Sequence, residues 1–473
     1  MIKTWMKKLS RLEWALFVFL MLFFSFFFNE NPGWNVSSRM NLVYSIVDLG
    51  RFNIDYYVSM PDWKREYKTE DLSFYEGRFY CDKSPILSFL GVPVYWVYAQ
   101  VHDVLNIKCD PLKGRYPVTL FTVSLFTSIL AILVFRMLGE IRKSPRDQLM
   151  TTLFFSLGSV GTCYAILFMA HQLSSLLIFL GFFLVYYCLK FWDTWSDRRK
   201  AIVLASAGFS VGLATATETP TAIGMIGITI YAYFSLPDRK YMAWFVPAAI
   251  VAMILPMPYN WACFGSPFSS GYQYEAHPVF RAEMSRGISG VGLPSWTAFW
   301  GITFSNYRGL FFTAPFLLFA FPGLYYWWKN ASARKELLLS LFLIVGFIGY
   351  NSSYWAWYGG WAFGPRLLVP MVPFLVLVAY YYLPRLKYLF YTLGIMSVLM
   401  HVMVLLTDPQ IPESYDAPFA QFTIPRFLEG NFTRSILSVW GLDRRVSVLI
   451  FLIFVVIGIS YLYWLAGHDP KSE

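Results

Sequence analysis

Side chains that can carry out acid–base and phosphate chemistry gather in one stretch of the sequence. They are Arg39, Asp48, Arg51, Asp55, Asp71, Asp82 and Lys83. A carboxylate can remove a proton from a hydroxyl group, and a nearby ammonium can neutralise a phosphate that leaves with an electron pair. We assign the first role to Asp55 or Asp71 and the second to Lys83. In the alternative interpretation, Asp82–Lys83 and Asp71–Arg78 are solvated loop pairs.

The composition indicates that these residues belong to a membrane protein. Of 473 residues, 57% are apolar, 20% are aromatic and only 14% are charged, and mean hydropathy is +0.49. Soluble proteins have about 45–50% apolar and about 25% charged residues. A soluble domain, a disordered chain and a disulfide-stapled module are therefore excluded. The net charge of +10 lies in short loops between apolar runs, which argues against nucleic-acid binding.

We predict an all-α polytopic membrane protein with about twelve transmembrane helices, because each span needs about 20 mostly apolar residues. The expected spans are 13–29, 117–138, 149–169, 172–190, 201–217, 220–235, 243–262, 310–328, 336–353, 365–383, 387–407 and 446–466. Residues 1–407 then form one transmembrane domain that includes the outer loop 29–116, and residues 408–473 add an outer loop and a last helix.

The positive charges set the orientation, since short cytoplasmic loops are enriched in Lys and Arg. Lys7 and Lys8 precede the first span, which we expect to be uncleaved, and basic clusters follow at 142–146, 198–200 and 334–335. Both termini are thus predicted to be cytoplasmic, with the polar mass on the outer face. There, Met40–Leu49 is expected to lie flat on the membrane, and Pro85–Val101 to be re-entrant or juxtamembrane. Asp55, Asp71 and Lys83 would then lie at headgroup depth.

Further polar residues fall at the outer ends of later spans. Arg308 and Arg366 stand in Gly-rich, aromatic outer loops, a setting suited to phosphate recognition. His171 and Glu218 lie at outer turns, where Glu218 either lines a cavity or caps the helix that starts at Pro220. No spacing of His or Cys predicts a metal site, and the five cysteines are either ordinary thiols or include a Cys81–Cys109 disulfide.

The order of several motifs resembles a known family. They are Tyr80-Cys81-Asp82-Lys83-Ser84-Pro85, Phe168-Met169-Ala170-His171, Gly265-Ser266-Pro267-Phe268-Ser269-Ser270-Gly271-Tyr272, Phe304-Ser305-Asn306-Tyr307-Arg308-Gly309-Leu310-Phe311 and Tyr358-Gly359-Gly360-Trp361-Ala362-Phe363-Gly364-Pro365-Arg366. With one span followed by a long outer loop, this order resembles the C-type (GT-C) membrane glycosyltransferases. Within that family, it resembles the branch of the protein O-mannosyltransferases and the lipid A aminoarabinose transferases. The resemblance extends over about residues 10–385.

The resemblance implies an inverting transfer of one sugar from a polyprenyl-phosphate donor, with no cofactor, on the outer face of a bacterial inner membrane. The acceptor is an unspecified glycan, lipid or protein. Residues that would bind the donor phosphate are Lys83, Arg39, Arg308 and Arg366. Residues that would line the cavity are His171, Glu218, Tyr80, Asp82 and Trp361.

One departure from the family concerns the catalytic base. These enzymes usually carry an Asp-Glu pair just after the first span, whereas alignment on Trp34 and Arg39 places Val36-Ser37-Ser38 there. The base would then be Asp55, slightly favoured because it is nearer that position, or Asp71. Two alternatives stay open. One is a transporter or flippase of a lipid-linked precursor, which would need access to both faces. The other is an inactive scaffold of the same fold.

Overall fold

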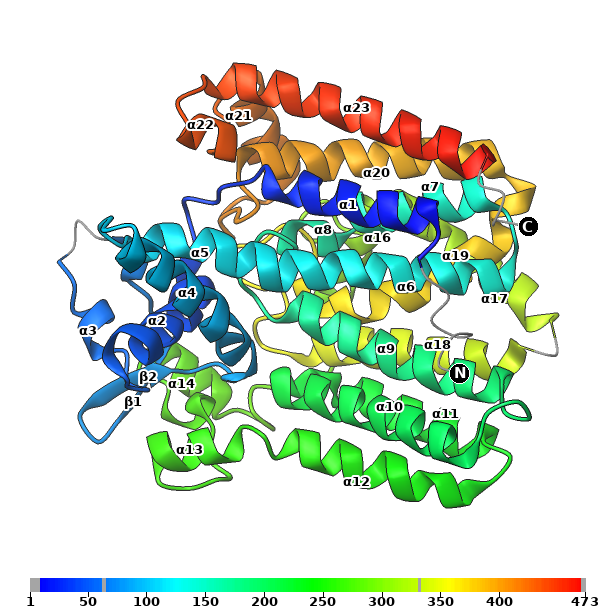
Figure 1. The fold of residues 1–473 in the computed structure, drawn as a ribbon, viewed down its shortest axis with the longest axis horizontal. Coiled ribbons are helices and arrows are strands. Elements are labelled where there is room, and N and C mark those ends of the chain that lie inside the picture. The colour runs from blue at the N-terminus through cyan, green and yellow to red at the C-terminus, as the bar shows by residue number, and fades with distance from the viewer. Residues whose placement is uncertain (1–8, 62–64, 331–332, 469–473) are drawn as a thin grey trace.

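A computed structural model describes residues 9–61, 65–330 and 333–468 as a bundle of long helices with a smaller group of elements at one end (Figure 1). Eight helices in this part of the chain are long and apolar enough to cross a membrane. They cover Pro111–Ile141, His171–Lys190, Asp197–Thr217, Arg239–Phe264, Arg334–Ser353, Arg366–Arg385, Lys387–Thr407 and Arg444–His468. Each covers one of the predicted spans to within one residue, so the chain is an integral membrane protein with the expected helical class.

These eight regions are built from the following elements: α5 (Pro111–Thr119), η2 (Leu120–Ser124), α6 (Leu125–Ile141), α9 (His171–Lys190), α10 (Asp197–Thr217), η4 (Arg239–Tyr241), α12 (Met242–Met253), α13 (Met257–Phe264), α18 (Arg334–Ser353), η8 (Arg366–Met371), α19 (Val372–Tyr382), η9 (Leu383–Arg385), α20 (Lys387–Thr407) and α23 (Arg444–His468). The segment η2 is a single π-helical stretch inside one continuous helix.

The other four predicted spans are shorter or broken. They form α1 (Arg11–Ser25), α7 (Pro145–Leu157) with α8 (Val160–Tyr164), η3 (Thr219–Thr221) with α11 (Ala222–Ser235), and α16 (Leu310–Thr313) with η6 (Pro315–Phe319) and α17 (Ala320–Trp328). Gly158 ends α7, and Pro315 interrupts the last of these regions. They nevertheless pack within the bundle, as Figure 1 shows for α1, α7, α11 and α17.

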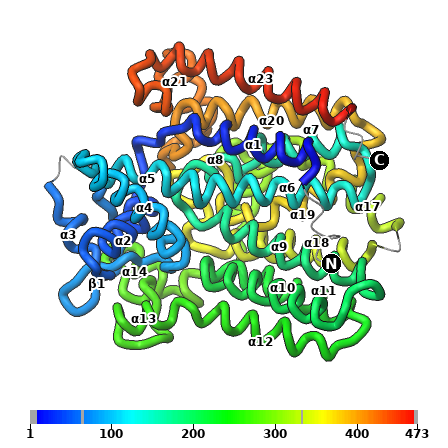
Figure 2. The backbone as a smooth tube through the Cα atoms, viewed as in Figure 1, coloured from blue at the N-terminus to red at the C-terminus, as the bar shows by residue number. Residues whose placement is uncertain are grey.

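Most of the remaining elements lie at one end of the bundle. They include α2 (Gly33–Leu49), α3 (Asp55–Val58), η1 (Arg65–Tyr67), β1 (Leu72–Tyr75), β2 (Arg78–Cys81), α4 (Ile86–Val104), η5 (Gly271–Tyr274), α14 (Pro278–Met284) and α15 (Trp296–Thr303). The end of the chain adds η10 (Phe419–Thr423), α21 (Ile424–Leu428) and α22 (Ile436–Val439). In the tube view, α1 begins and α23 ends at the opposite end of the bundle (Figure 2). Lys7 and Lys8 lie outside the described residues.

The first loop differs from the sequence prediction in one respect. Met40–Leu49 was expected to lie flat on the membrane surface, but it forms the second half of α2, whose residues Val36–Ser45 are buried. Tyr44, for example, is only 1% exposed because it packs against Tyr57 and Tyr95. The reason is that α4, β2, η1 and α3 all pack on α2. As predicted, α4 is not among the candidate spans.

Aromatic packing and ion pairs hold the bundle together. The ring of Phe451 in α23 stacks on Phe26 at 4.2 Å and contacts Phe23, which joins the last helix to α1. At the other end of α1, Glu13 forms an ion pair of 2.5 Å with Arg136 in α6. Outward-facing apolar side chains such as Val456, which is 65% exposed, remain available to lipid. All five cysteines are free, so the expected possibility of a Cys81–Cys109 disulfide is not realised.

Candidate active site

A β-hairpin brings two carboxylates of the first loop side by side. Strands β1 and β2 pair in antiparallel fashion with Leu72 opposite Cys81. The connecting residues Glu76 and Gly77 have φ values of 47° and 77°, as a tight two-residue turn with both central residues at positive φ requires. Asp71 precedes the first paired residue and Asp82 follows the last, so the register places them at the same end of the hairpin.

Lys83 lies between these two carboxylates. Its Nζ atom is 3.3 Å from Asp71 Oδ2 and also contacts Asp82 Oδ2. The ammonium also lies 5.0 Å from the centre of the Tyr272 ring. Burial alone would lower the pKa of Lys83, but Asp71 and Asp82 outweigh it and raise that pKa well above the usual value. The side chain is therefore a fixed positive charge, only 10% exposed.

Asp82 is anchored by the helix that follows the first span. Its Oδ1 atom accepts a hydrogen bond of 3.2 Å from the hydroxyl of Ser38 in α2. The neighbouring Arg39 is buried and donates to Asn35 Oδ1 and to the backbone oxygen of Ser84, both at 3.1 Å. Arg39 thus fixes the backbone just beyond Lys83. Its positive charge also acts on the pKa of Asp82, which burial raises.

A residue that the sequence analysis did not consider, Glu275, completes the cluster. It is 2% exposed, and its backbone forms an isolated bridge with Ser73 in β1. The turn before it crosses the hairpin, where the hydroxyl of Ser73 donates to the oxygen of Gly271 at 2.8 Å. A side chain on Gly271 would place its Cβ 2.6 Å from Asp82 Cα. In the sequence, the sole signal for this segment is the motif from Gly265 to Tyr272, and that motif ends before Glu275.

A histidine–carboxylate pair lies at the same end of the bundle. His171 Nδ1, at the start of α9, is 2.8 Å from Glu218 Oε1, just after α10. The Ser84 hydroxyl donates to the backbone oxygen of Ala216 at 2.6 Å, which ties the loop after Lys83 to this helix end. Burial would raise the pKa of Glu218, but His171 and Arg39 outweigh it and lower that pKa. Glu218 is therefore ionised and engaged with His171.

Two of the residues expected near the donor have different surroundings. Arg308 is fully buried, and its guanidinium donates to the backbone oxygens of Gly360, Ala362 and Ile411. Its two Nη atoms fasten the loop after α18 to the loop after α20, whereas its Nε atom is buried without a hydrogen-bond partner. Because the residue is 0% exposed, we withdraw its assignment to the phosphate. Trp361 is 50% exposed in the same loop.

Arg366 is half-buried, and its Nε atom is buried without a hydrogen-bond partner. Its side chain packs against Gly359, whose added Cβ would lie 3.2 Å from it. The positive charges of Arg366 and Lys83 both act on Tyr354, whose pKa burial raises. Arg366 and Lys83 thus both act on Tyr354, and Arg366 keeps an unsatisfied donor.

Asp55 and Tyr80 contact residues outside the Lys83 cluster. The carboxylate of Asp55 accepts a hydrogen bond of 2.6 Å from the backbone N–H of Phe79. It therefore fixes β2 to the start of α3 and makes no ion pair with Lys83. The ring of Tyr80 packs edge-on against Phe264, 5.5 Å between centres. Of the two predicted bases, the structure brings Asp71 alone to Lys83.

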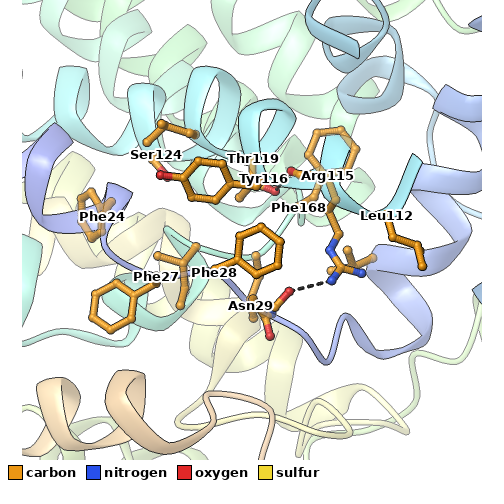
Figure 3. Close-up of a pocket in the computed structure, with 14 residues that line it drawn as sticks. Phe24, Phe27, Phe28, Asn29, Leu112, Arg115, Tyr116, Thr119, Ser124 and Phe168 are labelled. Carbon is orange, nitrogen blue, oxygen red and sulfur yellow. Dashed lines mark hydrogen bonds between the residues drawn. The ribbon is translucent and has the colours of Figure 1, made fainter. Parts of the chain in front are cut away.

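A separate pocket lies between the end of α1, the residues that follow it, and α5 (Figure 3). The rings of Phe24, Phe27, Phe28 and Tyr116 surround it, and Arg115 at its edge donates to the backbone oxygen of Asn29 at 2.6 Å. None of the residues of the Lys83 cluster lines this pocket. In the described part of the chain, no group of three or more His, Cys, Asp or Glu side chains has the arrangement of a metal site.

Comparison with solved structures identifies the fold. The crystal structure of ArnT from Cupriavidus metallidurans in the apo state matches with a TM-score of 0.53 at 14% identity, covering 96% of this chain and 76% of ArnT. The same protein bound to undecaprenyl phosphate gives a TM-score of 0.49 at 15% identity, covering 97% and 76% of the two chains. The oligosaccharyltransferase of Archaeoglobus fulgidus in the apo form gives 0.43 at 11% identity, covering 99% and 57%.

No protein-family model matches the sequence, and no curated protein matches it significantly. ArnT, a lipid A aminoarabinose transferase, is a C-type membrane glycosyltransferase. The likeness to its apo structure confirms the fold that the sequence motifs predicted: this chain has the fold of the C-type membrane glycosyltransferases.

Proposed function

We propose that this protein is a membrane glycosyltransferase. It moves a sugar from a polyprenyl-phosphate donor to an acceptor on the outer, non-cytoplasmic face of the membrane. The observation that carries the proposal is the arrangement of Lys83, whose ammonium lies 3.3 Å from Asp71 within a cluster at one end of the bundle. A fixed cation can neutralise a phosphate leaving group, and a neighbouring carboxylate can remove the proton of an acceptor hydroxyl. The fold of apo ArnT supports the same class.

The proposed reaction is a single displacement with inversion. The carboxylate of Asp71 removes the proton of the acceptor hydroxyl, and the oxygen attacks the anomeric carbon of the donor sugar. The bond between that carbon and the phosphate oxygen breaks, and the electron pair leaves on the polyprenyl phosphate. Lys83 faces this developing charge, and Arg366 adds an unsatisfied donor from the loop after α18. No cofactor takes part.

We assign the base to Asp71 rather than Asp55 because only Asp71 contacts Lys83. Asp82 is less suited, since Lys83 and Ser38 occupy its two oxygens. The departure at Val36-Ser37-Ser38 supports the same assignment. The resemblance predicts an acid at the position of Val36-Ser37-Ser38. There, the Ser38 hydroxyl instead contacts Asp82, a carboxylate at the end of the hairpin.

The two alternatives fit less well. An inactive scaffold has no need to keep Lys83 between Asp71 and Asp82 in a buried site. A flippase must open at the end of the bundle opposite the cluster. There, Asp147 in α7 pairs with Lys387 in α20 at 2.7 Å, and Glu13 pairs with Arg136. These ion pairs join helices at that end, which we propose to be the cytoplasmic side of a bacterial inner membrane, and a flippase would have to break them.

The experiment is an assay of the purified protein with a panel of radiolabelled polyprenyl-phosphate sugars and a membrane extract as the acceptor source. We expect label from one donor to enter the extract with the parent protein and not with Lys83→Ala. Chelation of divalent metals should leave the transfer unchanged. If no donor transfers label, or if the donor is moved between leaflets without breaking the sugar–phosphate bond, the proposal is wrong.

A further inference from the structure

The contact between the carboxyl groups of Glu275 and Asp82 needs an explanation. The backbone of Glu275 bridges to Ser73 and the turn before it lies against Asp82, so the two buried carboxyl groups act on each other, although ionised carboxylates can only accept hydrogen bonds. Glu275 is 2% exposed and Asp82 is 1% exposed, so water cannot screen them. The Oε2 atom of Glu275 is buried and has no donor. Two carboxyl groups in such a position cannot both be ionised, and a proton must lie between them.

The hydrogen bonds decide which of the two carboxyl groups carries this proton. Both oxygens of Asp82 already accept, Oδ1 from Ser38 and Oδ2 from Lys83, so Asp82 is the ionised partner. Glu275 has no cation of its own, because the guanidinium of Arg281 donates to the backbone oxygen of Glu275, at 2.8 Å, and not to its carboxyl group. The proton therefore belongs on Glu275, which then donates to Asp82.

We infer that Glu275 is a positioning residue of the proposed transferase: as a neutral acid it hydrogen-bonds Asp82 and keeps the surroundings of Lys83 open to a lipid phosphate. This inference rests on the proposed function. With Glu275 neutral, Lys83 faces two carboxylates; with Glu275 ionised it would face three. A third buried negative charge would repel an anionic donor from its binding site. Glu275 does not touch the reacting atoms in this scheme.

The electrostatics of the cluster agree with this role. Burial and the charge of Asp82 raise the pKa of Glu275 to about 9. Donor binding should therefore be strong below that pH and weaken as Glu275 ionises above it. Lys83 keeps its proton in this window, because Asp71 and Asp82 hold its pKa well above the usual range, and burial raises the pKa of both Tyr272 and Tyr354. The remaining charged or titratable neighbours are Asp71, Arg39, His277 and Arg281.

The test is the pH dependence of donor binding by the full-length protein in detergent. The probe is a polyprenyl methyl phosphate, because a phosphodiester keeps one negative charge across the range used. For the parent we expect the dissociation constant to rise roughly tenfold or more between pH 8 and pH 10. Glu275→Gln can still donate to Asp82 but cannot ionise, so its affinity should equal that of the parent at pH 8 and stay constant. Glu283→Gln changes a half-buried acid of the neighbouring helix α14, which pairs with Arg286, and should behave as the parent.

Infrared difference spectroscopy gives a second readout that does not depend on binding. A pH step from 8 to 10 should remove the carbonyl band of a protonated carboxylic acid in the parent and in Glu283→Gln, and show no such loss in Glu275→Gln. The inference would be overturned if the donor affinity of the parent did not change with pH. It would also be overturned if Glu275→Gln lost donor affinity, or lost the carbonyl band, as much as the parent does. Absence of binding at every pH, or binding by Lys83→Ala equal to that of the parent, would instead count against the proposed function itself.

Discussion

Asp71 and Lys83 form a 3.3 Å ion pair across the open end of a β-hairpin, although a full strand–turn–strand unit separates them in the chain. The hairpin register is what creates this pair, because Leu72 opposite Cys81 leaves Asp71 facing Asp82. A slip of one residue would move every side chain to the other face. The site therefore depends on the Glu76-Gly77 turn as much as on the charged residues.

The first prediction concerns Lys83. Lys83→Ala removes charge-assisted contacts to the donor phosphate, worth about 1.5–3 kcal/mol each, and should weaken donor binding about 10- to 100-fold. The measurement is the dissociation constant for undecaprenyl phosphate in detergent, with thermal unfolding to check that the variant is folded. Lys113→Ala is the control, since Lys113 is an exposed cation of α5 on the same side of the bundle. Equal affinity in Lys83→Ala and the parent would show that Lys83 does not bind the phosphate.

The second prediction separates the two candidate bases. Asp71→Asn should keep donor binding and lose turnover by roughly 10²- to 10⁴-fold, the contribution of general base catalysis. Asp55→Asn loses a charged acceptor for the backbone N–H of Phe79, so it should lower the melting temperature while turnover per folded protein stays near that of the parent. The reverse pattern, an inactive Asp55→Asn and a fully active Asp71→Asn, would return the base to Asp55.

The span pattern shows how far the sequence predicts this fold. Eight predicted spans coincide with long helices because apolar length alone defines them. The other four regions are apolar enough to lie in the bundle, but Gly158 and Pro315 break two of them, and local backbone geometry is not visible in mean hydropathy. Likewise Met40–Leu49 was expected at the surface because its apolar residues have helical spacing, and its contacts with α4, β2, η1 and α3 bury the helix.

Part of the candidate site could likewise be predicted from the sequence, and part could not. Asp71, Asp82 and Lys83 could be grouped from the sequence because they lie in one loop. Glu275 could not, because its contact with Asp82 depends on a turn from a distant loop that crosses the hairpin at Gly271. Arg308 was assigned to a phosphate because an arginine in a Gly-rich loop suits one. The structure gives it three backbone oxygens, a role that no sequence pattern distinguishes from ligand binding.

The third prediction tests the close approach of the Gly271 turn to Asp82 in the hairpin. Gly271→Ala places a Cβ 2.6 Å from the Cα atom and the backbone oxygen of Asp82, neither of which can move without shifting the hairpin. We expect overpacking of about 1–3 kcal/mol, seen as a lower melting temperature, together with weaker donor binding. Gly349→Ala in α18 is the control, since nothing lies within 4 Å of its added Cβ and alanine favours a helix. A Gly271→Ala protein with parental stability and binding would show that the turn does not constrain Asp82.

The last prediction concerns the opposite end of the bundle, where Asp147 joins α7 to neighbouring segments. Its carboxylate accepts from Tyr391 at 2.6 Å and pairs with Lys387 at 2.7 Å and Arg142 at 2.8 Å. Burial would raise the pKa of Asp147, but Lys387, Tyr391, Ser144 and Arg142 outweigh it and lower that pKa to about 2. A lowered pKa stabilises the folded state at pH values above the ordinary value of 3.8, and this contribution is lost as the pH falls toward 2.

Asp147→Asn should therefore lower the free energy of unfolding at pH 7 by about 1.5–3 kcal/mol, because it leaves two cations without their acceptor. The melting temperature of the parent in detergent should fall between pH 4 and pH 2.5 by more than that of Asp147→Asn, which has no carboxylate left to protonate. Asp238→Asn, which removes an exposed partner of Lys240, is the control and should follow the parent at every pH. If Asp147→Asn and the parent lose stability in parallel over this range, another carboxylate governs the acid sensitivity and the Asp147 cluster does not hold α7 against α20.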